Sequence, residues 1–372
     1  MLKRALDQAA TSLFVTSPNP RVGCILCDSA GAILGEGHTQ AAGGPHAEIM
    51  ALQDAANLGN PVYGATAYVT LEPCSHHGRT GPCCDALIRA GIRKVVAAQT
   101  DPNPLVSGQG FARLRAAGVE VDVLDPSDPI AIAARELNIG FFSRMVRKTP
   151  WVRMKIAASL DGKTALLNGE SQWITAPEAR ADGHVWRARA CAVLTGIGTV
   201  LQDNPKLDVR LVNTPRQPHL VIIDSKLKTP LDAALFSPSR KILIYGVVAD
   251  DSKTAALMQR GVTVIHMPGH DAAGVPTGKV DLAAALRDLA QREINELHVE
   301  AGYKLNGSLV REGLVDEFLV YLAPKLLGQG TGMADFGPLT TIASSLPLEF
   351  RSVERIGADL RVLARVTGRG DF

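Results

Sequence analysis

The chain has 372 residues, 46% of them apolar, so it can bury more than one hydrophobic core and two domains are expected. Lys and Arg number 39 against 37 Asp and Glu, with no long block of one sign, which argues against a nucleic-acid tail or a membrane-seeking face and favours a small-molecule substrate. The N-terminus lacks the apolar core of a secretion signal, and no apolar run approaches the length that a bilayer needs, so we expect a cytoplasmic protein.

The first third of the chain alternates helical and strand patterns. Apolar residues at helical spacing predict a helix over residues 2–13, and residues 21–28 and 31–38 predict a hairpin of strands. Further along we predict a helix over 47–59, a strand over 64–73, a helix over 84–91, and strands over 94–104 and 119–125. Alternation of this kind predicts an α/β layer sandwich.

A basic stretch that ends in proline, residues 143–150, fits a link between two domains, which we place at 1–145 and 150–372. A second α/β pattern follows the link. Strands are predicted over 151–165, 190–200, 219–225, 241–246, 262–268, 296–302 and 317–328, with helices near 176–190 and 281–293.

Residues 72–84, "EPCSHHGRTGPCC", combine cysteines and histidines in a way that suits a disulfide clasp, a structural metal site or part of a catalytic metal site. Six cysteines in so long a chain, without a secretion signal, favour free thiols or metal ligands over disulfides. Cys24 and Cys27 form a C-x-x-C pair, but a separation of three in a strand puts them on opposite faces, so we interpret both as core residues.

Upstream of this loop stands "PHAE", and a His-x-Glu followed by Pro-Cys and a further Cys is the signature of zinc deaminases. The predicted zinc ligands are His46, Cys74 and Cys83, with Cys84 as the alternative to Cys83. Three ligands leave a fourth position for water, whose pKa zinc lowers towards neutrality. Glu48 is then the predicted catalytic residue that moves the proton, and its place in the first turn of a helix favours its anionic form.

Eight residues separate Cys74 from Cys83, whereas generic zinc deaminases have Pro-Cys-x-x-Cys. The longer loop "EPCSHHGRTGPC" resembles that of the riboflavin-pathway pyrimidine deaminases, in which the insert reaches over the substrate. The resemblance implies a cytidine-deaminase-like three-layer sandwich, Cys83 as the ligand after Pro82, and a set of substrate contacts that otherwise read as turn, capping or solvated loop residues: Asn19, His38, His76, Arg79 and Asn103.

The second half carries "MKIAASLDGKTA", "GESQWIT", "GIGTVLQDNPKLDVR" and "VEAGYKLNGSL". From Trp151 onward it resembles the dihydrofolate-reductase-like half of the bifunctional riboflavin deaminase-reductases, which implies NADPH as cofactor. The implied cofactor contacts are Ala157, Trp173, Thr199, Asp203, Ser225, and the helix start Gly302, Tyr303, Lys304, Leu305, Asn306, Gly307 and Ser308; the implied substrate contacts are Ser171, Arg187, Leu207, Arg210 and Glu300. Tyr303 and Lys304 depart from the small residues, proline and threonine usual in the family.

The resemblance spans nearly the whole chain and implies two activities. They are zinc-dependent hydrolytic deamination of 2,5-diamino-6-(5-phospho-ribosylamino)pyrimidin-4(3H)-one and NADPH-dependent reduction of the ribosyl group of the deaminated product to ribityl. It also implies phosphorylated pyrimidines as the small-molecule partners and a homo-oligomer, a dimer or a tetramer, built through the reductase domain.

Three alternatives stay open at the level of sequence. A nucleic-acid-editing deaminase would need a basic surface rich in aromatic residues, yet aromatic residues make up 5% of the chain. A zinc module without enzymatic activity would normally have a fourth Cys or His ligand. The third alternative keeps the fold with only one working half.

Overall fold

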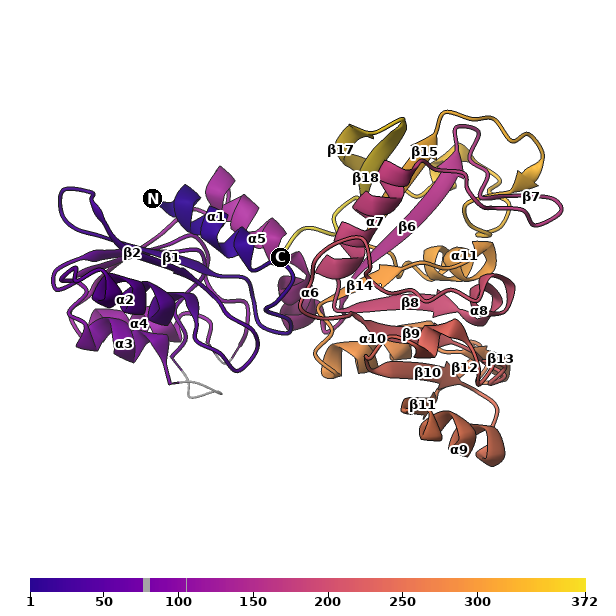
Figure 1. Ribbon diagram of the computed structural model, residues 1–372, viewed down its shortest axis with the longest axis horizontal. Helices are drawn as coiled ribbons and strands as arrows, with labels where there is room; N and C mark the ends of the chain where they lie inside the picture. The colour runs from indigo at the N-terminus through magenta and orange to yellow at the C-terminus, as the bar shows by residue number, and fades with distance from the viewer. Residues whose placement is uncertain (76–80, 105) are drawn as a thin grey trace. The chain divides into compact units, whose positions relative to one another are not determined.

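The computed structural model describes residues 1–75, 81–104 and 106–372 of the chain. It divides into two compact units, Met1–Lys148 and Thr149–Phe372 (Figure 1). The basic stretch 143–150 is not an extended link, because helix α6 (Ile139–Arg147) runs through most of it. The chain passes from α6 to the second unit through residues 148–150.

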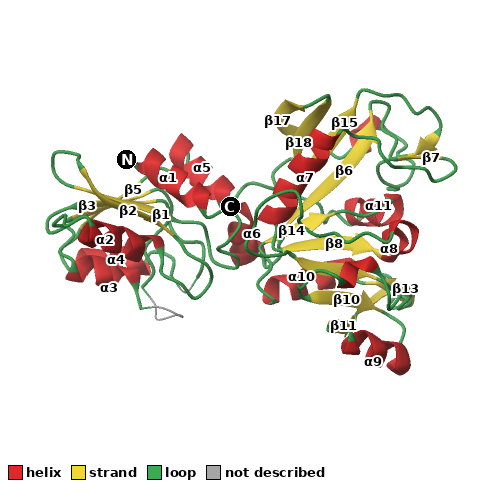
Figure 2. Cartoon of the chain, in the orientation of Figure 1, coloured by secondary structure: helices red, strands yellow, loops and turns green. Residues whose placement is uncertain are grey.

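The N-terminal unit is a three-layer α/β sandwich. Its sheet has the order β2-β1-β3-β4-β5, in which β1 is antiparallel to β2 and β3, and β3, β4 and β5 are parallel. The strands are β1 (Gly23–Cys27), β2 (Ile33–His38), β3 (Thr66–Val69), β4 (Lys94–Ala97) and β5 (Glu120–Val123). The other helices are α1 (Leu2–Thr11), α2 (Ala47–Asn57), α3 (Cys83–Arg89), α4 (Gln109–Ala116) and α5 (Pro129–Leu137). Figure 2 shows α2, α3 and α4 on one face of the sheet and α1 and α5 on the other.

Helix α2 lies unusually close to strand β2, and glycine makes this possible. A Cβ atom on Gly35 would stand 2.4 Å from the carbonyl oxygen of Ala51, and one on Gly37 would stand 2.5 Å from the Ala51 nitrogen. Both distances are far below van der Waals contact, so only glycine allows this packing. The close approach fixes the first turn of α2, which carries the predicted catalytic residue, against the end of β2.

The C-terminal unit is built on a large, mostly parallel sheet of order β11-β10-β9-β8-β14-β6-β15-β18-β17, in which β18 and β17 run antiparallel to their neighbours. Its strands are β6 (Trp151–Ser159), β8 (Ala192–Gly196), β9 (His219–Ile223), β10 (Ile242–Gly246), β11 (Val262–His266), β14 (Glu296–Val299), β15 (Glu317–Ala323), β17 (Leu348–Ile356) and β18 (Asp359–Val366). The helices are α7 (Pro177–Arg189), α8 (Ile197–Asp203), α9 (Asp251–Gln259), α10 (Leu282–Gln291) and α11 (Tyr303–Arg311). Short 3-10 helices, Ala234–Phe236 and Ile342–Ser344, and two small ribbons, β7 (Ala165–Leu166) with β16 (Gly330–Thr331) and β12 (Pro268–His270) with β13 (Pro276–Val280), complete it.

Alternate residues of β6 serve the two faces of this sheet. Val152, Met154 and Ile156 pack into the core under α10 and α11, while Arg153 faces α7, with its guanidinium 4.6 Å from the Trp186 ring. Arg153 is fully buried and pairs with Glu296 (3.0 Å) and Glu317 (2.7 Å).

The ends of the C-terminal unit meet. The ring of Phe372, the last residue, lies 6.3 Å from the ring of Trp151, the first residue of β6. Trp151 is fully buried. The chain therefore returns to the strand with which the unit begins.

Candidate active sites

Three metal-binding side chains, far apart in sequence, converge in the N-terminal unit. One ligand atom from each of His46, Cys74 and Cys83 lies within 4.8 Å of the other two. The His46 Nδ1 atom is 3.6 Å from Cys74 Sγ and 3.3 Å from Cys83 Sγ. The backbone nitrogen of Cys83 also donates to Cys74 Sγ at 3.3 Å.

The fold brings each ligand to the site from a different element. His46 is the residue that precedes α2, Cys74 follows the end of β3, and Cys83 is the first residue of α3. Two helix starts therefore flank the loop after β3. The helix macrodipoles place partial positive charge there, which favours thiolate sulfur and a carboxylate.

The donor set fits zinc. Zn–N and Zn–S bonds of about 2.05 and 2.3 Å at a tetrahedral angle would separate nitrogen from sulfur by about 3.6 Å. The two nitrogen–sulfur distances in the structure, 3.6 and 3.3 Å, are close to this value. A hydrogen bond with the Cys83 side chain and one with His46 lower the pKa of Cys74 to about 4, so a thiolate forms readily at the site.

Glu48 lies beside this cluster in the first turn of α2 and is 3% exposed. Burial raises the pKa of Glu48 to about 7. A carboxyl group with a pKa near the working pH can both accept and donate a proton, which suits a general acid–base catalyst.

The other cysteines of this unit, Cys84, Cys24 and Cys27, are buried and have different surroundings. Cys84 is buried and its thiol donates to the carbonyl oxygens of Pro73 (3.2 Å) and Gly110 (3.5 Å), so it points away from His46. Burial raises the pKa of Cys84 to about 12. Cys24 and Cys27 are buried in β1, and Cys27 packs with Ala5 under α1.

The predicted substrate contacts of this unit lie on loops at the ends of strands. His38 ends β2, and its Nδ1 atom lies 3.2 Å from the Gln40 amide nitrogen. Gln40 in turn donates its backbone N–H to Pro45, the residue before His46. Asn103 follows β4, and Asn19 lies in the turn before β1, where its N–H donates to Thr16. His76 and Arg79 lie outside the described residues.

In the C-terminal unit, most of the predicted cofactor contacts follow the carboxyl ends of parallel strands. Thr199 is in α8 after β8, Ser225 follows β9, and Gly302 follows β14, while Ala157 lies near the end of β6 and Asp203 ends α8. A Cβ atom on Gly302 would be 3.7 Å from the Thr199 hydroxyl, so the starts of α8 and α11 lie side by side. This edge of an open α/β sheet is where such folds bind ligands.

Buried polar atoms at the same edge support a ligand there. Among the described residues, the Thr195 hydroxyl and the Asn306 carbonyl oxygen are buried without a hydrogen-bond partner. Groups of this kind normally find a partner in protein, water or ligand. The edge fits the polar groups of a dinucleotide, whose phosphates suit the N–H groups at the start of α11.

Residues 302–308 divide into exposed and buried members. Gly302 and Lys304 are exposed, and Tyr303 and Ser308 are half-buried. Leu305 packs over Gly196, whose added Cβ would stand 3.1 Å from the Leu305 side chain. Gly307 has a packing reason to be glycine, since a Cβ there would stand 1.8 Å from the Asp335 carbonyl oxygen. Of these seven predicted contacts, Gly302 and Lys304 are therefore the most exposed.

The predicted substrate contacts Arg187 and Glu300 bind each other. Arg187 Nε donates to Glu300 Oε1 at 2.7 Å and Nη2 to Oε2 at 2.9 Å, and Nη1 donates to the carbonyl oxygen of Asp208. Burial alone would raise the pKa of Glu300, but the charge of Arg187 and the neighbouring His298 ring, whose Nε2 atom lies 3.4 Å from Glu300 Oε1, hold it well below its usual range. Burial lowers the pKa of nearby Lys155.

Side chains that the sequence did not single out hold the segment with Leu207 and Arg210. Arg240 donates to the carbonyl oxygen of Leu207, and Gln217 bonds both the N–H (2.7 Å) and the carbonyl (2.8 Å) of Val209. His184 Nδ1 accepts the Arg210 N–H at 3.2 Å. Contacts between a side chain and a distant backbone leave no periodic signal in a sequence, so pattern analysis does not reveal them.

The other two predicted contacts lie on the loop before α7. Ser171 is half-buried, whereas Trp173 is 63% exposed with the Arg180 guanidinium 4.6 Å from its ring. An exposed aromatic ring at this place suits stacking on a ligand.

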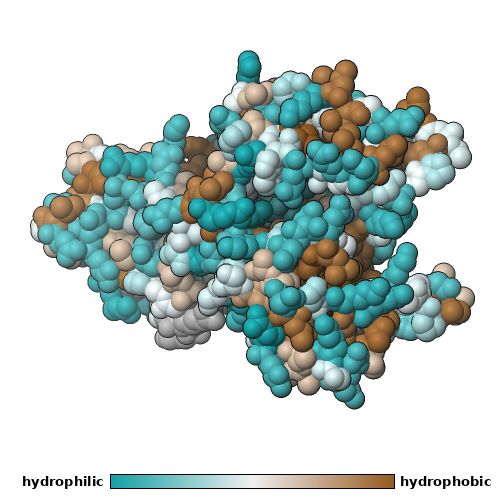
Figure 3. Space-filling model, turned by 45° about the vertical axis from the view of Figure 1, so that its right-hand side comes forward, coloured by the Kyte–Doolittle hydropathy of each residue, from teal (hydrophilic) through white to brown (hydrophobic). Residues whose placement is uncertain are grey.

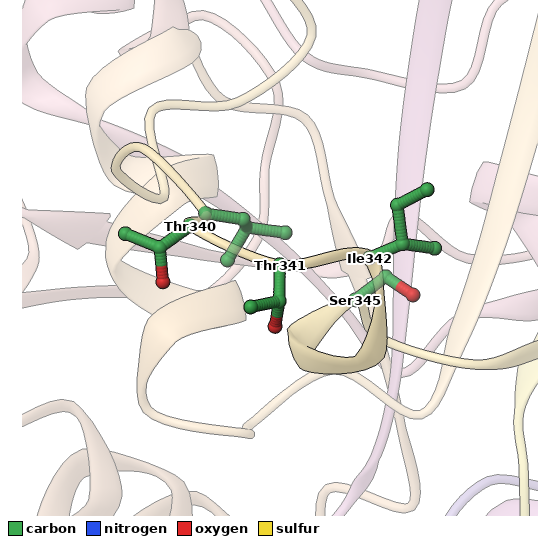
Figure 4. A pocket seen from close by; sticks show the side chains of 5 residues that line it. Thr340, Thr341, Ile342 and Ser345 are labelled. Carbon is green, nitrogen blue, oxygen red and sulfur yellow. The ribbon is translucent and has the colours of Figure 1, made fainter.

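A separate hollow of about 340 Å³ lies near the 3-10 helix Ile342–Ser344 (Figure 4). Its lining residues are exposed: Leu339, Thr340, Thr341, Ile342 and Ser345. None of these side chains is ionisable, so the hollow lacks the groups that either predicted reaction needs.

Two family models match the chain. Residues 1–99 match the cytidine and deoxycytidylate deaminase zinc-binding region, and residues 150–362 match the RibD C-terminal domain. With the ligand cluster and the fold, these matches define a zinc-binding deaminase domain joined to a reductase domain.

Curated relatives and solved structures extend the match over both domains. The riboflavin biosynthesis protein RibD of Escherichia coli (strain K12) is 41% identical over 368 residues, which cover 96% of each chain. RibD of Aquifex aeolicus is 42% identical over 359 residues, again with 96% of each chain covered. The structure of Acinetobacter baumannii RibD has a TM-score of 0.87 at 37% identity and covers 98% of each chain. The chain belongs to the RibD family of riboflavin biosynthesis proteins.

The chain is therefore a bifunctional enzyme of riboflavin biosynthesis, both a deaminase and a reductase. The first domain is of a zinc-binding type, and the second, a reductase domain, is of a type that uses a nicotinamide cofactor. The substrates of the enzyme are small molecules. Within residues 1–75, 81–104 and 106–372, every helix is too short or too polar to span a bilayer.

Proposed function

We propose that the first domain deaminates a diaminopyrimidinone ribose phosphate and that the second uses NADPH to reduce the ribosyl group of the resulting 5-amino-6-(5-phosphoribosylamino)uracil to ribityl. A Thermotoga maritima structure described as a deaminase and reductase for these compounds supports the substrates, with a TM-score of 0.83 at 31% identity over 98% of this chain and 97% of that one. The observation that carries the proposal is the cluster of His46, Cys74 and Cys83 beside buried Glu48.

The deaminase site assigns binding and proton transfer to different groups. His46, Cys74 and Cys83 hold zinc, which when bound supplies the Lewis acidity that makes water nucleophilic near neutral pH. Glu48 accepts one proton of the attacking water and delivers it to the ring nitrogen; it then transfers the second proton, from the new hydroxyl group, to the amine, which leaves as ammonia as the carbonyl forms. Its low exposure keeps bulk water away from that proton. Asn19, His38 and Asn103, with His76 and Arg79, are proposed to hold the pyrimidine and the ribose phosphate.

The reductase site is proposed at the carboxyl edge of the sheet. NADPH, when bound, supplies the hydride for C1′ of the ribose. The N–H groups at the start of α11 are proposed to bind its phosphates, and Thr199, Ser225 and Trp173 are proposed to contact the nucleotide. The Arg187–Glu300 pair is proposed to fix the substrate. Arg210, whose side chain is 52% exposed and pairs with Asp208 at 2.5 Å, is proposed to bind its phosphate.

The test follows ammonia release and NADPH oxidation together on the zinc-loaded full chain, with the diaminopyrimidinone ribose phosphate as substrate. Wild type should do both. Glu48→Gln, which keeps the shape of the side chain, should lose about 10²–10⁴-fold in ammonia release, yet oxidise NADPH normally when given the deaminated intermediate. Glu120→Gln, at an exposed carboxylate of β5 in the same domain, is the matched control and should behave as wild type.

Each failure has a separate meaning. No ammonia from zinc-loaded wild type would refute the substrate, and ammonia without NADPH oxidation would refute the reductase assignment. Ammonia release by Glu48→Gln at the wild-type rate would remove Glu48 from the mechanism. Replacing NADPH by NADH in the same assay tests the cofactor preference, and we expect NADPH to give the higher kcat/KM.

A homo-oligomer, dimer or tetramer, built through the reductase domain is part of the proposal. Strand β17 lies at the edge of the sheet, and edge strands offer unpaired backbone groups to a partner. Large apolar side chains are exposed on β17 and in the segment before it: Leu348 (44%), Phe350 (75%), Val353 (55%) and Ile342 (92%). Figure 3 shows that apolar residues interrupt the hydrophilic surface of the molecule. Sedimentation of Phe350→Glu against wild type tests this, because a monomeric wild type would refute it.

A further inference from the structure

Glu72 is a buried carboxylate next to the metal cluster that the proposed reaction does not use. It precedes Pro73 and Cys74 and is 3% exposed. Its Oε2 atom accepts the N–H groups of Asp101 (3.2 Å) and Gly108 (2.9 Å). Its Oε1 atom accepts those of Gly110 (2.8 Å) and Phe111 (3.3 Å). A carboxylate has about four lone-pair positions, so backbone donors occupy its full capacity.

These donors come from the two ends of one loop. Gly108 to Phe111 form the start of α4, whose N-cap Gly108 has no side chain that could satisfy the free N–H groups. Glu72 therefore caps α4 from another part of the chain, with its negative charge at the positive end of the helix. Asp101 lies at the other end, four positions after Ala97, the last residue of β4.

Asn103 lies between these two anchors, on the loop that Glu72 closes. Its N–H donates to Asp101 Oδ1 at 2.8 Å. Glu72 thus holds the Asp101 backbone, and the Asp101 side chain holds the backbone of Asn103.

Helix α4 touches the backbone that carries the metal ligand. A Cβ atom on Gly110 would stand 2.1 Å from the carbonyl oxygen of Pro73, so the two backbones are in direct contact. Arg113 of α4 also donates to the carbonyl oxygen of Ser75, the residue after Cys74. The position of Asn103 relative to Cys74 therefore depends on a short series of contacts through Asp101, Glu72 and the start of α4.

We propose that Glu72 is a positioning residue of the deaminase, which sets the place of Asn103 relative to the metal cluster and so acts on substrate binding. This inference rests on the proposed function, in which Asn103 contacts the pyrimidine. It assigns Glu72 no contact with substrate or metal.

A double-mutant cycle between Glu72→Gln and Asn103→Ala tests it in the zinc-loaded full chain. Gln turns one acceptor into an N–H₂ group that faces backbone donors, so we expect KM for the diaminopyrimidinone to rise 10–100-fold, with zinc content and NADPH oxidation of the deaminated intermediate unchanged. Asn103→Ala should show a similar loss. The double variant should then be no worse than Asn103→Ala by more than about twofold.

Independent losses that multiply in the double variant would overturn the proposal, as would loss of zinc from Glu72→Gln, because either would make Glu72 a general support of the fold. Glu72→Asp, which keeps the charge but reaches fewer donors, takes its place in the cycle if Glu72→Gln does not fold, and should show a smaller rise in KM. Wild-type activity is measured first on the same substrate, so failure of the proposed function appears as an inactive wild type and is not confused with failure of this inference.

Discussion

Replacing Arg187 by methionine should destabilise the C-terminal unit because it leaves the carboxylate of Glu300 buried without its partner. Both side chains are largely buried, at 11% and 13% exposure, and two hydrogen bonds of 2.7 and 2.9 Å join them. Removing one partner of a buried ion pair costs about 3–5 kcal/mol. Lysine keeps the charge but not the fork, so Arg187→Lys should lose about 1.5–3 kcal/mol, near the value of one charge-assisted hydrogen bond.

Urea unfolding followed by tryptophan fluorescence measures this in the full chain. The chain has three tryptophans, Trp151, Trp173 and Trp186, all in the C-terminal unit, so the signal reports on that unit alone. The control is the double variant Arg187→Met with Glu300→Leu, which removes both charges and should recover most of the lost free energy of unfolding. A loss below about 1 kcal/mol in Arg187→Met, or no recovery in the double variant, would refute the reasoning.

Two further predictions concern the metal ligands and the response to pH. Cys83→Ser should lose zinc and at least 100-fold in ammonia release, while Cys84→Ser should keep both; metal analysis of the two variants checks this, and the reverse pattern would exchange their roles. Burial lowers the pKa of His184 to about 4, whereas an unfolded histidine titrates near about 6.5. Between these values the unfolded state binds the extra proton, so the stability that neutral His184 contributes is complete above about pH 6.5 and falls as the pH drops towards 4. His184→Gln should flatten this part of the urea-unfolding profile, and an unchanged slope would contradict the assignment.

The metal cluster shows what sequence alone can supply. The order His-x-Glu, Pro-Cys, Pro-Cys was enough to choose three side chains that the fold places within 4.8 Å of one another, although 37 positions separate the first from the last. Residue type carries this information because few donor sets suit a zinc ion. The choice between Cys83 and Cys84 needed the resemblance, since both are buried at the start of α3 and only the structure shows which sulfur faces His46.

Secondary structure was predictable where a helix buries one face or where a short apolar run is buried on both faces. The helix expected over 47–59 is α2 (Ala47–Asn57), and the strand expected over 219–225 contains β9 (His219–Ile223). Strands β17 and β18 were missed. Strand β17 is exposed along most of its length, and a register shift between Phe350 and Ser352 breaks its alternation, so no buried face marks it in the sequence.

The side chains that hold the site loops in place were the least predictable part of the structure. Glu72 and Gln217 act through backbone N–H and carbonyl groups that every residue carries, so nothing in the partner segment identifies the contact. Gly307 was predicted as a cofactor contact, yet the structure also gives it a packing role against Asp335. Motifs locate reacting groups, whereas the geometry that holds them depends on distant backbone.

The contact between Phe372 and Trp151 has a practical meaning for anyone who handles this protein. Phe372 packs against Trp151, the first residue of β6. An affinity tag attached after Phe372 would therefore begin beside the start of β6, which lies four positions after Arg147, the last residue of α6. For the same reason the C-terminal unit is suited to circular permutation, since a short linker can join ends that already touch and new termini can be opened in an exposed turn such as Gly274.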